Sequence, residues 1–232
     1  MPAPMPLVLI PALLCDEALY RDMMPGLGGR VTPEVVMAPR PTLASSVTDI
    51  LGRAPSEFVL AGTSYGASLA IEVALAAPGR VRGLWLMGCD PGAPDPEQSL
   101  GIASMIEGQT KAAVAHLASL VVLPQHTAAA ETFKAMAGRV GGETGGAQMR
   151  ALAGRGAVWD RLHTLTMPSL VLWGAEDALV PVAVGRKLAD TLPHARFRAL
   201  NECGHLPTLE KPSEVAKLAS AWLNDEDLGH TC

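Results

Sequence analysis

A serine with a glycine two positions away on either side is the residue whose setting most clearly indicates chemistry. Ser64 lies in the pattern G-x-S-x-G, between Gly62 and Gly66. The apolar run 58–61 precedes this turn and a helix-forming segment, 67–77, follows it. Side chains at the glycine positions would collide in so sharp a strand-to-helix turn. The pattern predicts a nucleophile elbow, an exposed hydroxyl beside a helix N-terminus that favours negative charge. The alternative is an ordinary strand-turn-helix of a parallel α/β protein.

A serine hydroxyl is a weak nucleophile, so it needs a base to take its proton and a carboxylate to orient that base. Two later stretches supply candidates, each directly after a predicted strand. The first, W-G-A-E-D, ends at Asp177 and has Glu176 before it. The second, G-H-L-P-T-L-E-K-P, contains His205. Asp90 ends another predicted strand and is a third possible acid.

The composition restricts the possible classes of function. The chain has 232 residues, of which 49% are apolar, enough for one α/β domain with a buried core. A net charge of −5 and 4% aromatic residues argue against binding to nucleic acid or to an anionic membrane surface. The apolar start lacks the Lys or Arg of a signal peptide, so we expect a cytoplasmic protein. The four cysteines lack metal-ligand spacing and are expected to be reduced thiols: Cys15, Cys89, Cys203 and Cys232.

Apolar runs alternate with helix-like segments along most of the chain. Strands are expected at 7–10, 34–37, 58–61, 81–88, 169–173 and 195–200. Helices are expected between them at 16–24, 42–53 (with Thr42 as N-cap), 67–77, 182–192 and 213–223. This alternation predicts a right-handed, mostly parallel sheet of about six strands in a three-layer α/β/α sandwich. The active crevice of such a sheet lies at the carboxyl ends of its strands, where Ser64 is expected.

The segment between residues 91 and 167 has a different pattern. It opens with three prolines and shows no strand-like run. Helices are expected at 100–108, 111–123, 128–139 and 147–162, with a glycine-rich break at 138–146. We therefore expect a helical insertion in the α/β domain.

The motifs together resemble the α/β-hydrolase fold superfamily. The resemblance rests on the elbow, the G-x-x-D segment, the G-H-x-x-x-x-E-x-P segment and the order Ser64, Asp177, His205. It covers residues 7–95 and 166–223. It implies a core formed by residues 1–94 and 166–232, with residues 95–165 as a helical cap. Because six residues precede the first expected strand, we expect the family's opening antiparallel hairpin to be absent.

The resemblance also implies roles for these residues. Ser64 would be the nucleophile, His205 the general base and later acid, and Asp177 the group that fixes the imidazole tautomer. Asp90 remains an alternative acid, because some family members place the acid after that earlier strand, and Glu176 competes as a neighbour of Asp177. The other histidines have no such context: His116, His126, His163, His194 and His230.

The oxyanion hole of this family uses two backbone N–H groups. Tyr65, directly after the serine, would give one of them. Leu13 would give the other, with Leu14 possible, because Pro-Ala stands where family members usually have His-Gly. For substrate binding we expect Leu14, Tyr65 and Leu206. The cap would add apolar residues such as Met105, Leu120 and Met136.

The implied function is a serine hydrolase acting on carboxylic esters with small to medium acyl or alcohol groups, through an acyl-enzyme. Thioester, C–C bond or amide hydrolysis and cofactor-free perhydrolysis are alternatives on the same scaffold, as is a ligand-binding protein without catalysis. A haloalkane dehalogenase is disfavoured, because that chemistry uses Asp at the elbow. We expect a small-molecule substrate, a monomer or homodimer, and no cofactor, metal, nucleic-acid or membrane partner.

Overall fold

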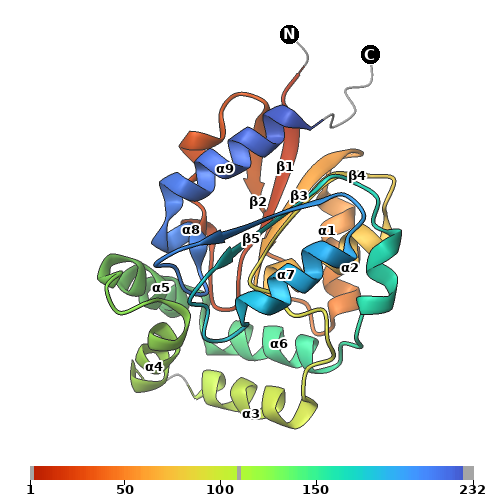
Figure 1. Cartoon of the computed structure of the whole chain (residues 1–232). Coiled ribbons are helices and arrows are strands. Elements are labelled where there is room, and N and C mark those ends of the chain that lie inside the picture. Colours follow the sequence, from red (N-terminus) through yellow and green to blue (C-terminus); the bar gives the residue numbers. More distant parts are fainter. Residues whose placement is uncertain (1–2, 109–110, 227–232) are drawn as a thin grey trace.

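A parallel sheet forms the centre of the molecule (Figure 1). The computed structural model describes residues 3–108 and 111–226. In this part of the chain six strands form one sheet with the order β2-β1-β3-β4-β5-β6, and every neighbouring pair is parallel. The strands are β1 (Met5–Ile10), β2 (Val31–Val35), β3 (Phe58–Thr63), β4 (Val81–Met87), β5 (Ser169–Gly174) and β6 (Ala195–Leu200). The expected fold class is confirmed.

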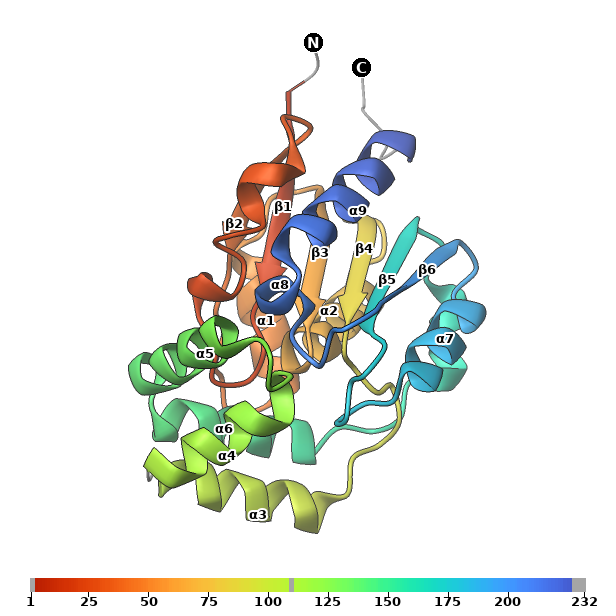
Figure 2. The same cartoon turned by 60° about the vertical axis from the view of Figure 1, so that its left-hand side comes forward.

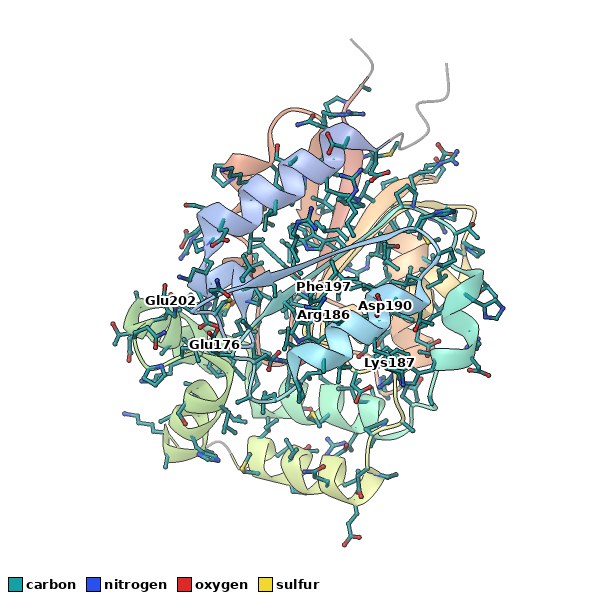
Figure 3. All side chains as sticks on the ribbon, viewed as in Figure 1. Glu176, Arg186, Lys187, Asp190, Phe197 and Glu202 are labelled. Carbon is teal, nitrogen blue, oxygen red and sulfur yellow. The ribbon has the colours of Figure 1, made fainter. Side chains whose placement is uncertain are left out.

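Helices cover both faces of the sheet, so the central strands are buried on both sides. On one face lie α1 (Leu43–Arg53), α2 (Tyr65–Ala76) and α7 (Val182–Thr191); α9 (Pro212–Asp225) covers the other (Figure 2). Alternate residues of β1 contribute to two separate hydrophobic clusters, Leu7 and Leu9 to one, Val8 and Ile10 to the other. This burial explains why the strand is a continuous apolar run. Next to the edge strand β6, the guanidinium of Arg186 lies over the Phe197 ring at 4.8 Å (Figure 3).

Four helices gather at the carboxyl ends of the strands (Figures 1 and 2). They are α3 (Pro96–Glu107), α4 (Lys111–Val121), α5 (Thr127–Val140) and α6 (Gly142–Ala153), and we refer to them as the cap helices. Two further short helices are η3 (Trp159–Thr164), which contacts α7, and α8 (Pro207–Glu210), which contacts α5 and α9. Among the described helices, none combines the length and apolar character needed to cross a bilayer.

The glycine-rich break expected at 138–146 is wrong. Helix α5 continues to Val140 and α6 begins at Gly142, so Gly141, at φ 82°, is the junction. Gly145 lies inside α6, and only glycine fits there, because a Cβ would overlap the side chains of Leu14 and Ile106. Close packing against these residues outweighs the poor helix propensity of glycine. Helix α6 also ends at residue 153, earlier than the expected 162.

Two smaller differences concern the segment before the elbow. The expected helix 16–24 is replaced by two 3₁₀ turns, η1 (Glu17–Leu19) and η2 (Met24–Leu27). Asp16 caps the first turn by accepting a hydrogen bond from the amide of Ala18 at 3.0 Å. The second strand is shifted to Val31–Val35, where it pairs with β1 at the sheet edge and tolerates a proline. Thr42 caps α1 as predicted, in a reciprocal capping box with Ser45.

The packing of α6 gives a first prediction. Gly145→Ala should lower the free energy of unfolding by about 1–3 kcal/mol, because the added methyl group overpacks the contact with Leu14 and Ile106. Gly138→Ala is the matched control, since a Cβ at this exposed position of α5 meets nothing within 4 Å. The control should raise the free energy of unfolding by about 0.5 kcal/mol. Urea unfolding of both variants measures the difference, and an equal stability of the two would contradict the packing argument.

Candidate active site

The turn between β3 and α2 holds Ser64 in a strained conformation. Its φ is 55° and its ψ −117°, and its amide donates to the carbonyl of Met87 at 2.8 Å. A Cβ on Gly62 would overlap the backbone of Gly66, and a Cβ on Gly66 would overlap the carbonyl of Ile10. The two glycines therefore let the first turn of α2 approach both its own strand and the end of β1.

The three residues expected to form a triad lie in one hydrogen-bonded line. His205 Nε2 is 2.9 Å from Ser64 Oγ, and His205 Nδ1 is 2.8 Å from Asp177 Oδ2. The other carboxylate oxygen, Oδ1, accepts hydrogen bonds from the amides of Leu179 and Val180, both at 2.9 Å. His205 is 3% exposed and Asp177 6% exposed. The carboxylate is thus fixed by its own loop and can hold the imidazole with one oxygen.

The two alternative acids make other contacts. Glu176, after β5 (Figure 3), accepts a hydrogen bond from the amide of Cys203 at 3.0 Å. Asp90 is exposed and accepts one from the amide of Gly92 at 2.7 Å. Both carboxylates cap loops, and no hydrogen bond joins either of them to the imidazole among the described residues.

Two backbone amides beside Ser64 are free to bind an oxyanion. The N–H groups of Leu13 and Tyr65 have no hydrogen-bond acceptor in the described part of the chain, and both residues line the same cavity as Ser64. Leu14, the other residue considered in the first loop, donates its amide to Gln148 Oε1 at 3.1 Å. The arrangement therefore favours Leu13 over Leu14 as the second donor.

A buried carboxylate organises the loop that carries His205. Glu210 accepts hydrogen bonds from the amides of Gly204 at 3.0 Å, Leu206 at 3.3 Å and Leu123 at 3.1 Å. The first two amides flank His205, and the third follows α4. This glutamate is part of the G-H-x-x-x-x-E-x-P motif, but no role was assigned to it from the sequence. Its spacing of five residues from the histidine is the feature of the sequence that indicates one.

A tyrosine joins the end of β1 to the elbow. Tyr20 Oη donates to the carbonyl of Ile10 at 2.7 Å, so the hydroxyl of Thr63, at 3.0 Å, donates to Tyr20. Complete burial raises the pKa of Tyr20, which keeps the phenol protonated as this geometry requires. Nothing in the sequence near Tyr20 indicates this contact, because its partner Thr63 is 43 positions away.

A cavity of about 410 Å³ opens above Ser64 and is lined mainly by apolar side chains. Leu14, Tyr65 and Leu206, expected to bind substrate, all line it. From the cap helices come Ile102, Met105, His116, Leu117, Leu120, Val121, Phe133, Met149 and Leu152. Met136 is instead fully buried in the core. Among the described lining residues none is Lys, Arg, Asp or Glu. His116 was not predicted to line the cavity, because no motif surrounds it in the sequence.

The described cysteines, and the side chains that could bind a metal ion, were considered as alternative sites. The thiols of Cys15, Cys89 and Cys203 are buried, and burial raises the pKa of each, to about 12 for Cys89. A thiol protonated at neutral pH is a poor nucleophile. No group of three His, Cys, Asp or Glu residues in this part of the chain could hold a metal ion. Cys232 and His230 lie outside the described residues.

Comparisons with known proteins place the chain in a family. A model of the alpha/beta hydrolase family matches residues 20–218. The proline iminopeptidase of Lactobacillus delbrueckii subsp. bulgaricus is 35% identical over 68 residues, which are 29% of this chain and 23% of that protein. The 2-hydroxy-6-oxononadienedioate/2-hydroxy-6-oxononatrienedioate hydrolase of Cupriavidus pinatubonensis is 30% identical over 156 residues, 62% of this chain and 54% of that protein. The chain thus matches between a quarter and about half of the length of these relatives.

A solved structure shares the fold over the whole chain. The thermophilic esterase from Thermogutta terrifontis superposes with a TM-score of 0.83 at 22% identity, covering 100% of this chain and 92% of that one. At this identity the likeness concerns the fold alone.

The role of Glu210 can be tested through stability. Glu210→Gln replaces one of the two accepting oxygens with an N–H donor, so at least one buried amide loses its acceptor. We expect the free energy of unfolding to fall by about 1–3 kcal/mol. Glu131→Gln is the control, since Glu131 forms a single exposed ion pair with Lys134 and its loss should change stability by less than about 0.5 kcal/mol. Similar urea midpoints for the two variants would show that Glu210 does not organise the loop.

Proposed function

Since the chain belongs to the alpha/beta hydrolase family, we propose that it is a serine hydrolase that cleaves carboxylic esters with small to medium, uncharged acyl or alcohol groups. The observation that carries this proposal is the line of hydrogen bonds from Ser64 through His205 to Asp177 beside an apolar cavity. In this proposal the helical segment 95–165 acts as a cap on the core formed by 1–94 and 166–232.

The first half of the proposed reaction forms an acyl-enzyme. His205 Nε2 takes the proton of Ser64 Oγ as the oxygen attacks the ester carbonyl. The N–H groups of Leu13 and Tyr65 stabilise the oxyanion, while Asp177 stabilises the imidazolium through Nδ1–H. The intermediate collapses when His205 gives the proton to the leaving alcohol, which departs and leaves the acyl group on Ser64.

The second half releases the acid. A water molecule gives a proton to His205 as its oxygen attacks the acyl carbonyl. The same two amides bind the second oxyanion. When the intermediate collapses, Ser64 leaves with the proton returned by His205, and the enzyme is restored.

The charge of the cavity supports an uncharged substrate. The hydrolase of Cupriavidus pinatubonensis is named for a dioate, a substrate with two carboxylate groups. A carboxylate enclosed in the present cavity would find no Lys or Arg among the described lining residues. Burying a charge without a partner is strongly unfavourable. This difference favours neutral esters over dicarboxylate substrates.

The catalytic assignment is tested with short and medium p-nitrophenyl esters and with a fluorophosphonate probe. Ser64→Ala should lower kcat by about 10⁴–10⁶-fold and abolish labelling, because the nucleophile is removed. Asp177→Asn should lower kcat by about 10⁴-fold, whereas Asp90→Asn, the matched control, should retain it. Labelling without ester turnover would point to a thioester, C–C or amide substrate. Hydrolysis that survives in Ser64→Ala would refute the proposal, and failure of both signals in the native chain would favour a binding protein.

Substrate charge gives a separate prediction. The mono-p-nitrophenyl ester of glutaric acid should have a kcat/KM lower than that of p-nitrophenyl valerate by about tenfold or more, because its carboxylate meets no Lys or Arg among the described lining residues. The two esters have chains of equal length, so the comparison isolates the charge. An equal or higher kcat/KM for the charged ester would contradict the assignment of an uncharged substrate.

A further inference from the structure

The loop after β1 has an unusual backbone conformation at Leu14. Its φ is 59°, in the left-handed region that non-glycine residues seldom adopt. This residue directly follows Leu13, whose amide is a donor in the proposed oxyanion hole. Conformations of this kind persist only where surrounding contacts hold them. The contacts around Leu14 therefore decide how the neighbouring amide is presented.

Two contacts from one face of α6 hold Leu14. Its amide donates to Gln148 Oε1 at 3.1 Å, across 134 positions of sequence. Its side chain packs on Gly145, where no Cβ would fit. Gly145 and Gln148 are three residues apart, so they lie on the same face of the helix. Leu14 is 1% exposed and Gln148 4% exposed, so water cannot easily take the place of either contact.

The hydrogen bond to Gln148 also distinguishes two neighbouring donors. While Leu14 N–H is bonded to the amide oxygen, it is not available to an oxyanion, whereas Leu13 N–H has no acceptor in the described residues. We infer that Gln148 is a positioning residue of the oxyanion hole: by accepting the Leu14 amide it fixes the left-handed turn that presents Leu13 N–H beside Ser64. This inference rests on the proposed function, because it concerns the same oxyanion.

The effect should appear in the transition state and not in substrate binding. An oxyanion contact strengthens as the carbonyl oxygen gains charge, so a displaced donor lowers kcat and leaves KM nearly unchanged. Removal of one oxyanion donor costs about 10²–10³ in rate, and a displaced donor should cost less. Gln148→Met has a similar size and no accepting oxygen, so we expect its kcat on p-nitrophenyl butyrate to fall by about ten- to a hundredfold.

Three further measurements separate positioning from mere stability. Gln148→Glu keeps an accepting oxygen and should restore kcat only where its buried carboxyl is protonated, because a carboxylate near the oxyanion would repel it, so the kcat of this variant should fall as the pH rises. A trifluoromethyl ketone, which forms an oxyanion adduct with the serine, should bind Gln148→Met more weakly by the same factor as the fall in kcat. Arg150→Met is the control, because it removes the ion pair of α6 with Glu107 on α3 without touching the loop. It should keep native kcat and ketone affinity.

The outcomes separate this inference from the proposed function. If Gln148→Met is folded, as judged by circular dichroism, and keeps native kcat, or raises KM alone, Gln148 does not position the hole. That result leaves Ser64-dependent ester hydrolysis untouched. If Gln148→Met does not fold, Gln148→Asn serves as the test, because its shorter side chain moves the accepting oxygen away from the Leu14 amide. A lowered kcat in Gln148→Asn supports the inference, and a native kcat overturns it. Hydrolysis that does not depend on Ser64 would instead overturn the proposed function itself.

Discussion

The close contact between the first turn of α2 and the end of β1 is the constraint on which the site depends. Parallel pairing places Ile10 beside Gly62, and the missing side chain of Gly66 lets the helix reach the carbonyl of Ile10. Tyr20 and Thr63 tie the two strand ends together from the other side. As a result Leu13 and Ser64 line the same cavity, although the residues are far apart in sequence. The elbow and the first loop thus form one unit.

The cap helices contact both the loop after β1 and the loop that carries His205. Gln148 of α6 holds the loop after β1, and Arg139 of α5 forms an ion pair with Asp16 at its end, at 2.7 Å. Burial alone would raise the pKa of Asp16, but the bonds from Arg139 and from the amide of Ala18 outweigh it and lower the pKa. On the other side of the site, the backbone amide of His205 donates a hydrogen bond to the carbonyl of Val121, the last residue of α4, at 3.2 Å. These helices therefore hold the loops of the candidate site as well as lining the cavity.

The sequence was sufficient for features that depend on local pattern, and insufficient for features that depend on distant contacts. The six strands could be predicted because their apolar runs are bounded by glycine and proline. The three side chains that the structure joins could be identified because each follows a strand within a short motif. The start of α6 could not be predicted, because glycine at position 145 has a poor helix propensity and its contact with Leu14 is visible only in the structure. Gln148 has no motif, since its partner lies 134 positions away.

Two locally unfavourable choices in this chain explain each other. A glycine inside a helix costs about 1 kcal/mol relative to alanine, and a left-handed leucine costs about 1–2 kcal/mol. Gly145 and Leu14 are packed together, so the glycine makes the space that the leucine needs in its strained conformation. Departures from local preference concentrate at functional sites, where they fix a geometry that the chain would not otherwise adopt. Here Leu14 directly follows the residue whose amide the proposed mechanism requires, and Gly145 packs against Leu14, which connects the helix expected to break with the proposed chemistry at Ser64.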